Sequence, residues 1–145
     1  MYPARVDQKG RVKLPASFQE FLNSLPEKKL FATSLDRRTG SIYPIAVWRK
    51  NKDFLTLYKE DPKRRKRVIF NAQDLGADTE MDNQGRVLLS VELRRELGIE
   101  NQTVRVFFHN QRIEIYSEAM YQHMKADAAE TSSDDVEKLE SAGLL

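Results

Sequence analysis

The sequence predicts an α+β fold rich in β-strands, in which two similar half-domains share one core. A short phrase occurs twice, at residues 6–15 and 81–90, and the spacing from Asp7 to Asp82 is the same 75 residues as that from Arg11 to Arg86. Such a repeat indicates that both copies build the same backbone unit. At 145 residues with 40% hydrophobic side chains, the chain is about one domain long and can bury a substantial core.

The first copy begins with a strand and a helix. Residues 11–15 alternate between polar and apolar side chains, which is the period of a half-buried strand. A helix is expected to start at Pro15 and to end before Pro26, which has no backbone N–H to continue it. Apolar residues at helical spacing mark the buried face of this helix: Phe18, Phe21, Leu22 and Leu25.

A hairpin is expected after this helix. Residues 30–35 and 41–47 are two largely apolar segments separated by residues 36–40, which end in a glycine. This pattern predicts two antiparallel strands. Because Pro44 lacks an N–H, the second strand is expected to lie at a sheet edge or to carry a bulge.

The middle of the chain is expected to be a helical linker. Residues 48–58 carry apolar side chains at helical spacing, and Asp61 followed by Pro62 is a helix-start signal. Five consecutive basic residues follow at 63–67, and most are expected to be solvated because they cannot all share one helix face. The apolar residues 68–70 leave a short helix and a strand both open for this segment.

The second copy repeats the order of elements. Residues 86–89 predict a strand, and residues 91–97 predict a helix that Gly98 ends. A second hairpin is expected from residues 104–108 and 113–116. The predicted organisation is repeat 1 at residues 1–47, the helical linker with its basic run at 48–75, repeat 2 at 76–119, and a helix with an acidic, flexible tail at 120–145.

The net charge of +2 conceals an asymmetry. From Lys125 onward the chain holds six acidic and two basic residues, so the remainder carries +6. A helix is expected from Ser117 to about Lys125, and residues 131–135 suggest an irregular or weakly helical segment. A basic body permits nucleic-acid binding, and the acidic tail could fold back over it.

Several classes of function find no support in the sequence. The chain has no cysteine, so disulfides and thiolate metal sites are excluded, and His109 and His123 lack partners at a ligand spacing. No phosphate-binding loop or catalytic nucleophile signature occurs. We therefore expect no catalytic residue, cofactor, metal or small-molecule substrate. An apolar leader and a membrane-spanning run are also missing, which favours a cytoplasmic protein without a membrane partner.

The repeated phrase has the form Asp-x-x-Gly-Arg-Val if the two middle positions are counted as variable. Gly10 and Gly85 allow a tight turn with positive φ. The aspartate can accept backbone N–H groups or pair with the arginine, which leaves the turn on a rigid strand. Its planar fork suits two adjacent acceptors, as on a guanine edge or a phosphate. Hairpin chemistry alone would explain one copy, but two copies in register favour a DNA-contacting role. The candidate residues are Asp7, Lys9, Arg11, Lys13, Asp82, Gln84 and Arg86.

These residues resemble the MraZ family of bacterial transcriptional regulators, which contain two SpoVT/AbrB-type repeats. The resemblance lies in residues 7–16 followed by Phe18, in residues 80–87 followed by Leu93, and in the hairpin ends at 42–44 and 112–116. It extends from about Met1 to Tyr121. Gln19 stands where the family commonly has an arginine, and Asn110 stands where it often has a glycine.

The resemblance implies two AbrB-like swapped-hairpin repeats that form one pseudo-two-fold, β-barrel-like unit with short helices. It implies a ring-shaped homo-oligomer that binds double-stranded DNA at the nucleoid and represses the division and cell-wall gene cluster. It also places the DNA contacts on the Asp-x-x-x-Arg motif, matched by Asp7 with Arg11 and by Asp82 with Arg86. The alternative is an AbrB-like antitoxin or scaffold whose acidic, leucine-containing tail binds a partner protein. An enzyme is the weakest hypothesis.

Overall fold

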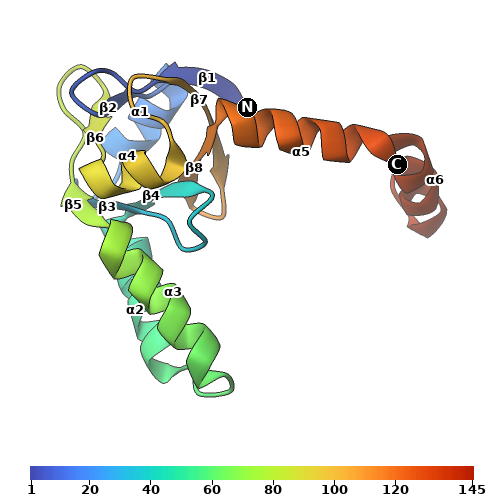
Figure 1. Ribbon diagram of the computed structural model, residues 1–145, viewed down its shortest axis with the longest axis horizontal. Coiled ribbons are helices and arrows are strands. Elements are labelled where there is room, and N and C mark those ends of the chain that lie inside the picture. Colours follow the sequence, from blue (N-terminus) through green and yellow to red (C-terminus); the bar gives the residue numbers. More distant parts are fainter.

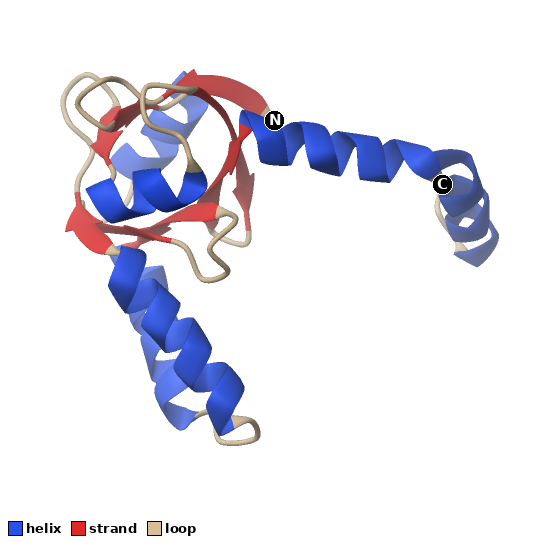
Figure 2. Ribbon diagram, viewed as in Figure 1, coloured by secondary structure: helices blue, strands red, loops and turns tan.

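A six-stranded antiparallel sheet frames the molecule in the computed structural model, which describes residues 1–145 (Figures 1 and 2). Its strand order is β1-β7-β8-β4-β3-β5, and β2 and β6 form a separate two-stranded sheet. The strands are β1 (Tyr2–Arg5), β2 (Arg11–Lys13), β3 (Leu30–Thr33), β4 (Gly40–Pro44), β5 (Ala77–Thr79), β6 (Arg86–Leu88), β7 (Thr103–His109) and β8 (Arg112–Ser117). The helices are α1 (Ala16–Asn23), α2 (Ile45–Leu57), α3 (Pro62–Leu75), α4 (Val91–Leu97), α5 (Glu118–Glu130) and α6 (Ser132–Ala142).

The mixed α+β class is confirmed, but the strands do not close into a barrel. The two predicted hairpins are β3–β4 and β7–β8, and pairing of β4 with β8 joins them into one sheet. The edges of this sheet are β1 and β5. The small sheet is linked to the chain beside those edges only by the isolated bridges Val6 to Val12 and Met81 to Val87. The two sheets therefore do not form one continuous, closed ladder of hydrogen bonds.

The two copies of the repeated phrase pair with each other. Strands β2 and β6 are antiparallel, with Val12 opposite Val87 at the centre of the register. The pairing continues past both strands, because Leu14 N–H donates to Gly85 O over 2.9 Å and Leu89 N–H donates to Gly10 O over 3.0 Å. Segments 75 residues apart thus share one sheet.

The main core lies between the sheets and helices α1 and α4 (Figure 2). Each copy of the phrase contributes alternate residues from its strand, as its period of two predicts. Each following helix contributes residues four apart, as an amphipathic helix does. The phrase residues and the helix residues are all buried: Val12, Leu14, Phe18, Leu22, Val87, Leu89, Leu93 and Leu97.

The prediction that Pro44 marks an edge or bulged strand is wrong. Strand β4 is central, between β8 and β3, and Pro44 is its last residue. Its pairing with β8 covers only residues 40–42, so the missing N–H of Pro44 removes no bond on that side. Residues 45–47, expected in the strand, form the first turn of α2 instead, with Pro44 at the N-cap. A proline preset to φ −53° leads readily into a helix.

Helices α2 and α3 form a helical hairpin, here called the arm, that projects from the body (Figure 1). The Asp61 side chain accepts the N–H of Arg64 over 3.0 Å, and Pro62 occupies the first turn, as the start signal predicts. The strand alternative for residues 68–70 is wrong because they continue α3. The arm is anchored at its base, where Trp48 stacks on Phe31 with 4.6 Å between ring centroids.

The C-terminal segment is helical and also projects from the body (Figure 1). Ser117 caps α5 by accepting the N–H of Met120, and Arg105 pairs with Glu118 over 3.1 Å. The helix expected to end near Lys125 continues to Glu130, and α6 follows after Thr131. The tail does not fold back over the repeated turns, because β2 and β6 lie on the side of the body away from α5 and α6 (Figure 1). No helix combines the length and apolar character that crossing a membrane would require.

Candidate nucleic-acid interface

The first copy of the motif forms a tight turn closed by Asp7. Gly10 has φ +85°, and its N–H donates to Asp7 O over 3.0 Å. The Oδ1 atom of Asp7 accepts the N–H groups of Lys9 and Arg11, each over 2.9 Å. The aspartate therefore holds both ends of the turn, and the positive φ explains why a glycine stands there.

The second copy has the same geometry. Gly85 has φ +76°, and Oδ1 of Asp82 accepts the N–H groups of Gln84 and Arg86, each over 2.9 Å. The N–H of Asp82 donates to Arg86 O over 2.8 Å, which matches the bond from Asp7 to Arg11 O. The identical spacing of the two phrases thus produces two equivalent turns.

Each arginine is held through its Nε atom, which leaves the two Nη groups of the guanidinium free. Arg11 Nε lies 3.0 Å from Asp7 Oδ2, and Arg86 Nε lies 2.9 Å from Asp82 Oδ2. The two Nη groups of each guanidinium bond to no other residue, and each side chain is 26% exposed. Both oxygens of each aspartate are engaged within the turn. The carboxylates therefore position the arginines, whereas the arginine Nη groups have no partner within the chain.

Hydrogen bonding lowers the pKa of both aspartates. The largest cause for Asp7 is the backbone N–H that Arg11 donates to its carboxylate, and for Asp82 it is the backbone N–H of Arg86. Partial burial opposes this effect, and the guanidinium of the same arginine adds to it. A donor directed at the charged form of a carboxyl stabilises that form.

The lowered pKa values make a testable prediction. A carboxyl whose pKa falls on folding stabilises the fold above its unfolded pKa, about 3.9 for Asp, and that contribution is lost as the pH falls through the lower folded pKa. We expect the carboxyl ¹³C signals of Asp7 and Asp82 to titrate below the midpoint of a blocked Asp peptide in the same buffer. In Arg11→Ala the midpoint of Asp7 should stay low, because the backbone N–H remains. A midpoint at or above the peptide value would contradict the turn geometry.

A side chain from the opposite copy covers each glycine. A Cβ added at Gly10 would lie 2.0 Å from Nη1 of Arg94, and one added at Gly85 would lie 2.2 Å from the amide of Gln19. Gln19 and Arg94 occupy equivalent positions of the repeat, since they are also 75 residues apart. Lys13 likewise crosses over, because its Nζ donates to Gln84 O. Each turn is thus braced by the other half of the chain.

Three residues beside the first turn are not predicted by the repeated phrase. Arg5 Nη2 donates to the Asn101 side-chain oxygen over 2.8 Å, and Arg94 lies over Gly10. A shallow hollow of about 300 Å³ lies beside the first turn. It is lined by Arg5, Asp7, Gln8, Lys9, Arg11 and Asn101. The alignment of Arg94 with Gln19 was a usable signal, but nothing local in the sequence indicated Asn101.

The two turns differ in charge. In the repeat alignment, Arg5 corresponds to Glu80 and Lys9 corresponds to Gln84. The first turn therefore has Arg5, Lys9, Arg11 and Arg94 around it, whereas the second has Arg86 and Lys13. An anionic ligand spanning both turns would meet more positive charge at the first. No group of three or more histidine, aspartate and glutamate residues is arranged to hold a metal ion.

The fold and the site together define a mixed α+β protein that presents two equivalent arginine-bearing turns from one small sheet. Comparison with known proteins identifies it further. The family model described as "MraZ protein, putative antitoxin-like" matches residues 76–140. A transcriptional regulator MraZ from Acidobacterium capsulatum is 33% identical over 144 residues, which cover 99% of this chain and 97% of that relative.

Two more relatives with the same name show comparable similarity. The protein from Caldicellulosiruptor saccharolyticus is 31% identical over 145 residues, and that from Lactobacillus gasseri is 30% identical over 148. Each alignment covers 99% of this chain and 96% of the relative. The chain belongs to the MraZ family, as the repeated phrase predicts.

Proposed function

We propose that this chain is a sequence-specific, double-stranded-DNA-binding transcriptional regulator that represses the bacterial division and cell-wall gene cluster. The relatives that carry the name transcriptional regulator support the general role. The observation that carries the proposal is the free fork of each arginine. In both turns Nε is held by an aspartate while the two Nη groups remain available.

The turn geometry suggests how the residues would share the work. A guanidinium held through Nε presents its two Nη donors side by side, which suits O6 and N7 of guanine or two phosphate oxygens. Arg11 and Arg86 would make these contacts, and Asp7 and Asp82 would fix their direction. Lys9, Lys13 and Gln84 lie beside them and would contact phosphate or base edges. Gly10 and Gly85 shape the turns.

We further propose that the chain consists of two swapped AbrB-like repeats and assembles into a ring. The symmetric register of β2 with β6, and the crossing of Gln19 and Arg94, support a pseudo-two-fold relation between the halves. Strands β1 and β5 leave sheet edges that a neighbouring copy could cover. A ring would present many turns to one DNA molecule, in the cytoplasm at the nucleoid.

Multivalent binding provides the test of this function. The DNA upstream of the chain's own gene should be retarded in a gel, and footprinting should define short repeated boxes. A duplex with several boxes in their natural spacing should bind roughly 10²–10⁴-fold more tightly than one with a single box, because later contacts become intramolecular.

The matched control keeps every box but inserts about half a helical turn of DNA between them, which places successive boxes on opposite faces. Affinity should then fall toward that of the single box. Equal affinity for one box and for the array would contradict multivalent recognition, and no preference over random duplex would contradict sequence specificity.

A second candidate function is that of an antitoxin or scaffold. The description of the matched family as antitoxin-like favours it, as do the exposed side chains of Val136 and Leu139 in the acidic tail. A toxin-type reading frame beside the gene would support this function. Neighbouring division genes would support the first.

A further inference from the structure

Helix α6 has an apolar face that nothing in its own chain covers. Val136 is 45% exposed and Leu139 is 57% exposed, and residues three apart lie on the same side of a helix. Leu144, beyond the end of the helix, is also 52% exposed. An isolated helix shorter than about 12–15 residues is marginal in water. An eleven-residue helix without a buried residue therefore needs a partner to persist.

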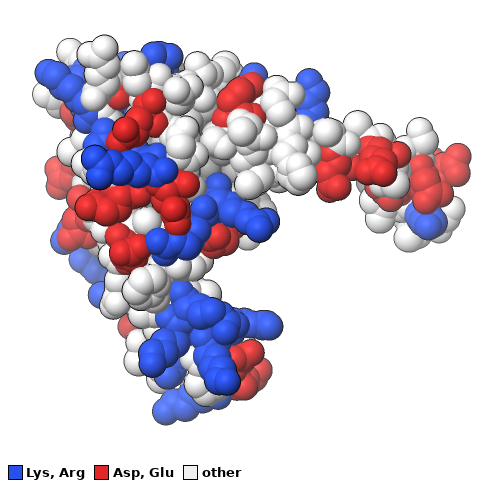
Figure 3. Space-filling model, viewed as in Figure 1, with Lys and Arg blue, Asp and Glu red and all other residues white.

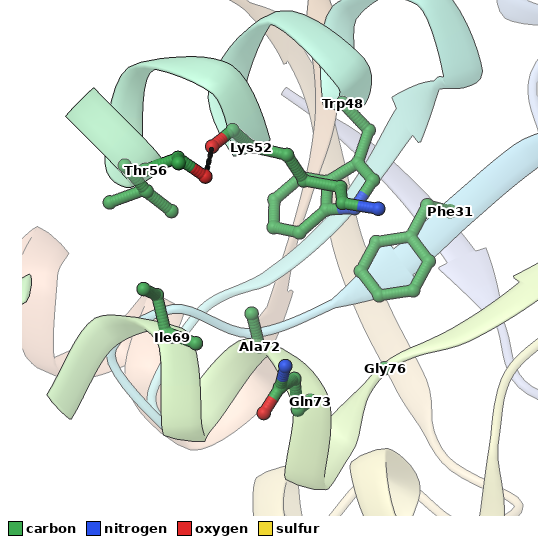
Figure 4. A pocket seen from close by; sticks show the side chains of 9 residues that line it. Phe31, Trp48, Lys52, Thr56, Ile69, Ala72, Gln73 and Gly76 are labelled. Atoms are coloured by element: carbon green, nitrogen blue, oxygen red, sulfur yellow. Dashed lines mark hydrogen bonds between the residues drawn. The ribbon is translucent and has the colours of Figure 1, made fainter. Parts of the chain in front are cut away.

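The arm contains an apolar cavity of about 550 Å³ between α2 and α3 (Figure 4). Trp48 and Phe31 stack at its base, and Lys52 and Thr56 extend from α2 on one side (Figure 4). Helix α3 supplies Ile69 from the other side. The cavity therefore offers apolar contacts from both helices of the arm.

Further exposed apolar side chains lie on the arm outside this cavity. Phe54 is 62% exposed, Leu57 is 74% exposed and Phe70 is 61% exposed. The arm therefore exposes apolar side chains outside the cavity as well.

The arm and the tail carry opposite charge. Residues 45–75 include nine basic and four acidic residues, and the segment from Lys125 onward includes two basic and six acidic residues. Figure 3 shows basic side chains gathered over the arm and acidic ones along the projecting tail. Lys66 shares a helix face with Ile69 and Gln73, which line the cavity, so positive charge reaches its rim from α3 as well as from Lys52.

The tail and the arm of one chain are held apart. They leave the body in different directions, and the continuous helix α5 lies between the body and α6 (Figure 1). A contact within one chain would require α5 to break, whereas a contact between two chains would not. The arm also lies away from the repeated turns in the same view, so a helix bound to it would leave those turns free.

We propose that α6 of one copy docks on the arm of a second copy. Val136 and Leu139 enter the mouth of the cavity, and Glu137 and Glu140, three residues apart beside them, face Lys52 and Lys66. This inference rests on the proposed self-association and specifies the two surfaces that make it. The contact is head-to-tail, since each chain offers one tail and one arm, and it can therefore link several copies in succession.

Charge reversal in the full-length chain tests the docking. The tail variant Glu137→Lys/Glu140→Lys and the arm variant Lys52→Glu/Lys66→Glu each place like charges together. Each should weaken self-association about tenfold or more in sedimentation velocity. A chain with all four substitutions should recover assembly, because every pair is then opposite again. All four side chains are exposed and form no hydrogen bond or ion pair in the chain, so the fold should be unaffected.

The matched control is Glu20→Lys/Glu92→Lys, which changes the charge by the same amount at exposed sites on α1 and α4. It should assemble like the unmodified chain. Assembly unchanged by the tail and arm reversals, or not restored by their combination, would overturn the docking while leaving self-association intact. A chain that is monomeric at every concentration would overturn both.

Measuring the affinity for random duplex DNA tests whether the arm binds DNA phosphates instead of α6. If the arm variant loses DNA affinity while its assembly is unchanged, the arm contacts phosphate instead of α6, and the docking is wrong. The proposed regulatory function is tested separately, by comparing the affinity of the assembled protein for its DNA boxes with and without the side chains of Arg11 and Arg86.

Discussion

Replacement of Arg11 and Arg86 by alanine together is expected to abolish most specific DNA affinity while the fold remains intact. Loss of one bidentate base contact costs roughly 1–3 kcal/mol, so two independent sites should lose roughly 2–6 kcal/mol per chain. Stability should change little, because both arginines and their aspartate partners are partly solvated and the turn is closed by backbone N–H groups.

Fluorescence anisotropy on a box-containing duplex measures the effect, and thermal unfolding verifies the fold. Arg95→Ala is the matched control, since that side chain is 75% exposed on α4 and belongs to neither turn. It should lower affinity only slightly. If the double variant binds as tightly as the unmodified chain, the free forks are not the DNA-contacting groups.

Replacement of the buried Gly10 by alanine is expected to cause a large loss of stability. The left-handed conformation at φ +85° costs an L-residue roughly 1–2 kcal/mol. The new Cβ would also lie 2.0 Å from Arg94 Nη1, so the guanidinium must leave the turn. The same reasoning applies to Gly85, where the amide of Gln19 is displaced.

Gly98 supplies the matched control for this prediction. It has φ +65°, but a Cβ there meets no atom within 4 Å, so Gly98→Ala reports backbone strain alone. Gly10→Ala should unfold at a lower temperature than Gly98→Ala. In an Arg94→Ala background the difference should disappear. Each kcal/mol corresponds to roughly 2–4 °C in a chain of about this size. Equal melting temperatures for both single variants would show that Arg94 does not brace the turn.

Local patterns in the sequence were sufficient to predict most elements. The alternation at residues 11–15, the helix start at Pro62 and the stop at Gly98 each correspond to an observed element. The turn at residues 110 and 111 also follows the local expectation, because Asn110 takes a positive φ of 49°. These features depend on interactions between near neighbours, which the order of residues specifies directly.

Errors arose where distant segments decide the environment of a residue. Pro44 predicts an edge or bulged strand because a proline interrupts a ladder, but β8 pairs only with residues 40–42 of β4, so the proline removes no hydrogen bond on that side. The structure adds that the oxygens of Asp7 and Asp82 accept hydrogen bonds within their own turns, which the repeated phrase left open beside a DNA-contacting role.

The sequence by itself determined the family, the two turns and the arginine that each presents, because a repeated phrase encodes the same local hydrogen bonds wherever it occurs. Only the tertiary structure decided that β2 pairs with β6, that Gln19 and Arg94 each cover the glycine of the opposite copy, and that the arm and tail project apart. The pairing and the two glycine contacts join residues between 66 and 84 positions apart. Their formation depends on burial of a shared core, which no single stretch of sequence specifies.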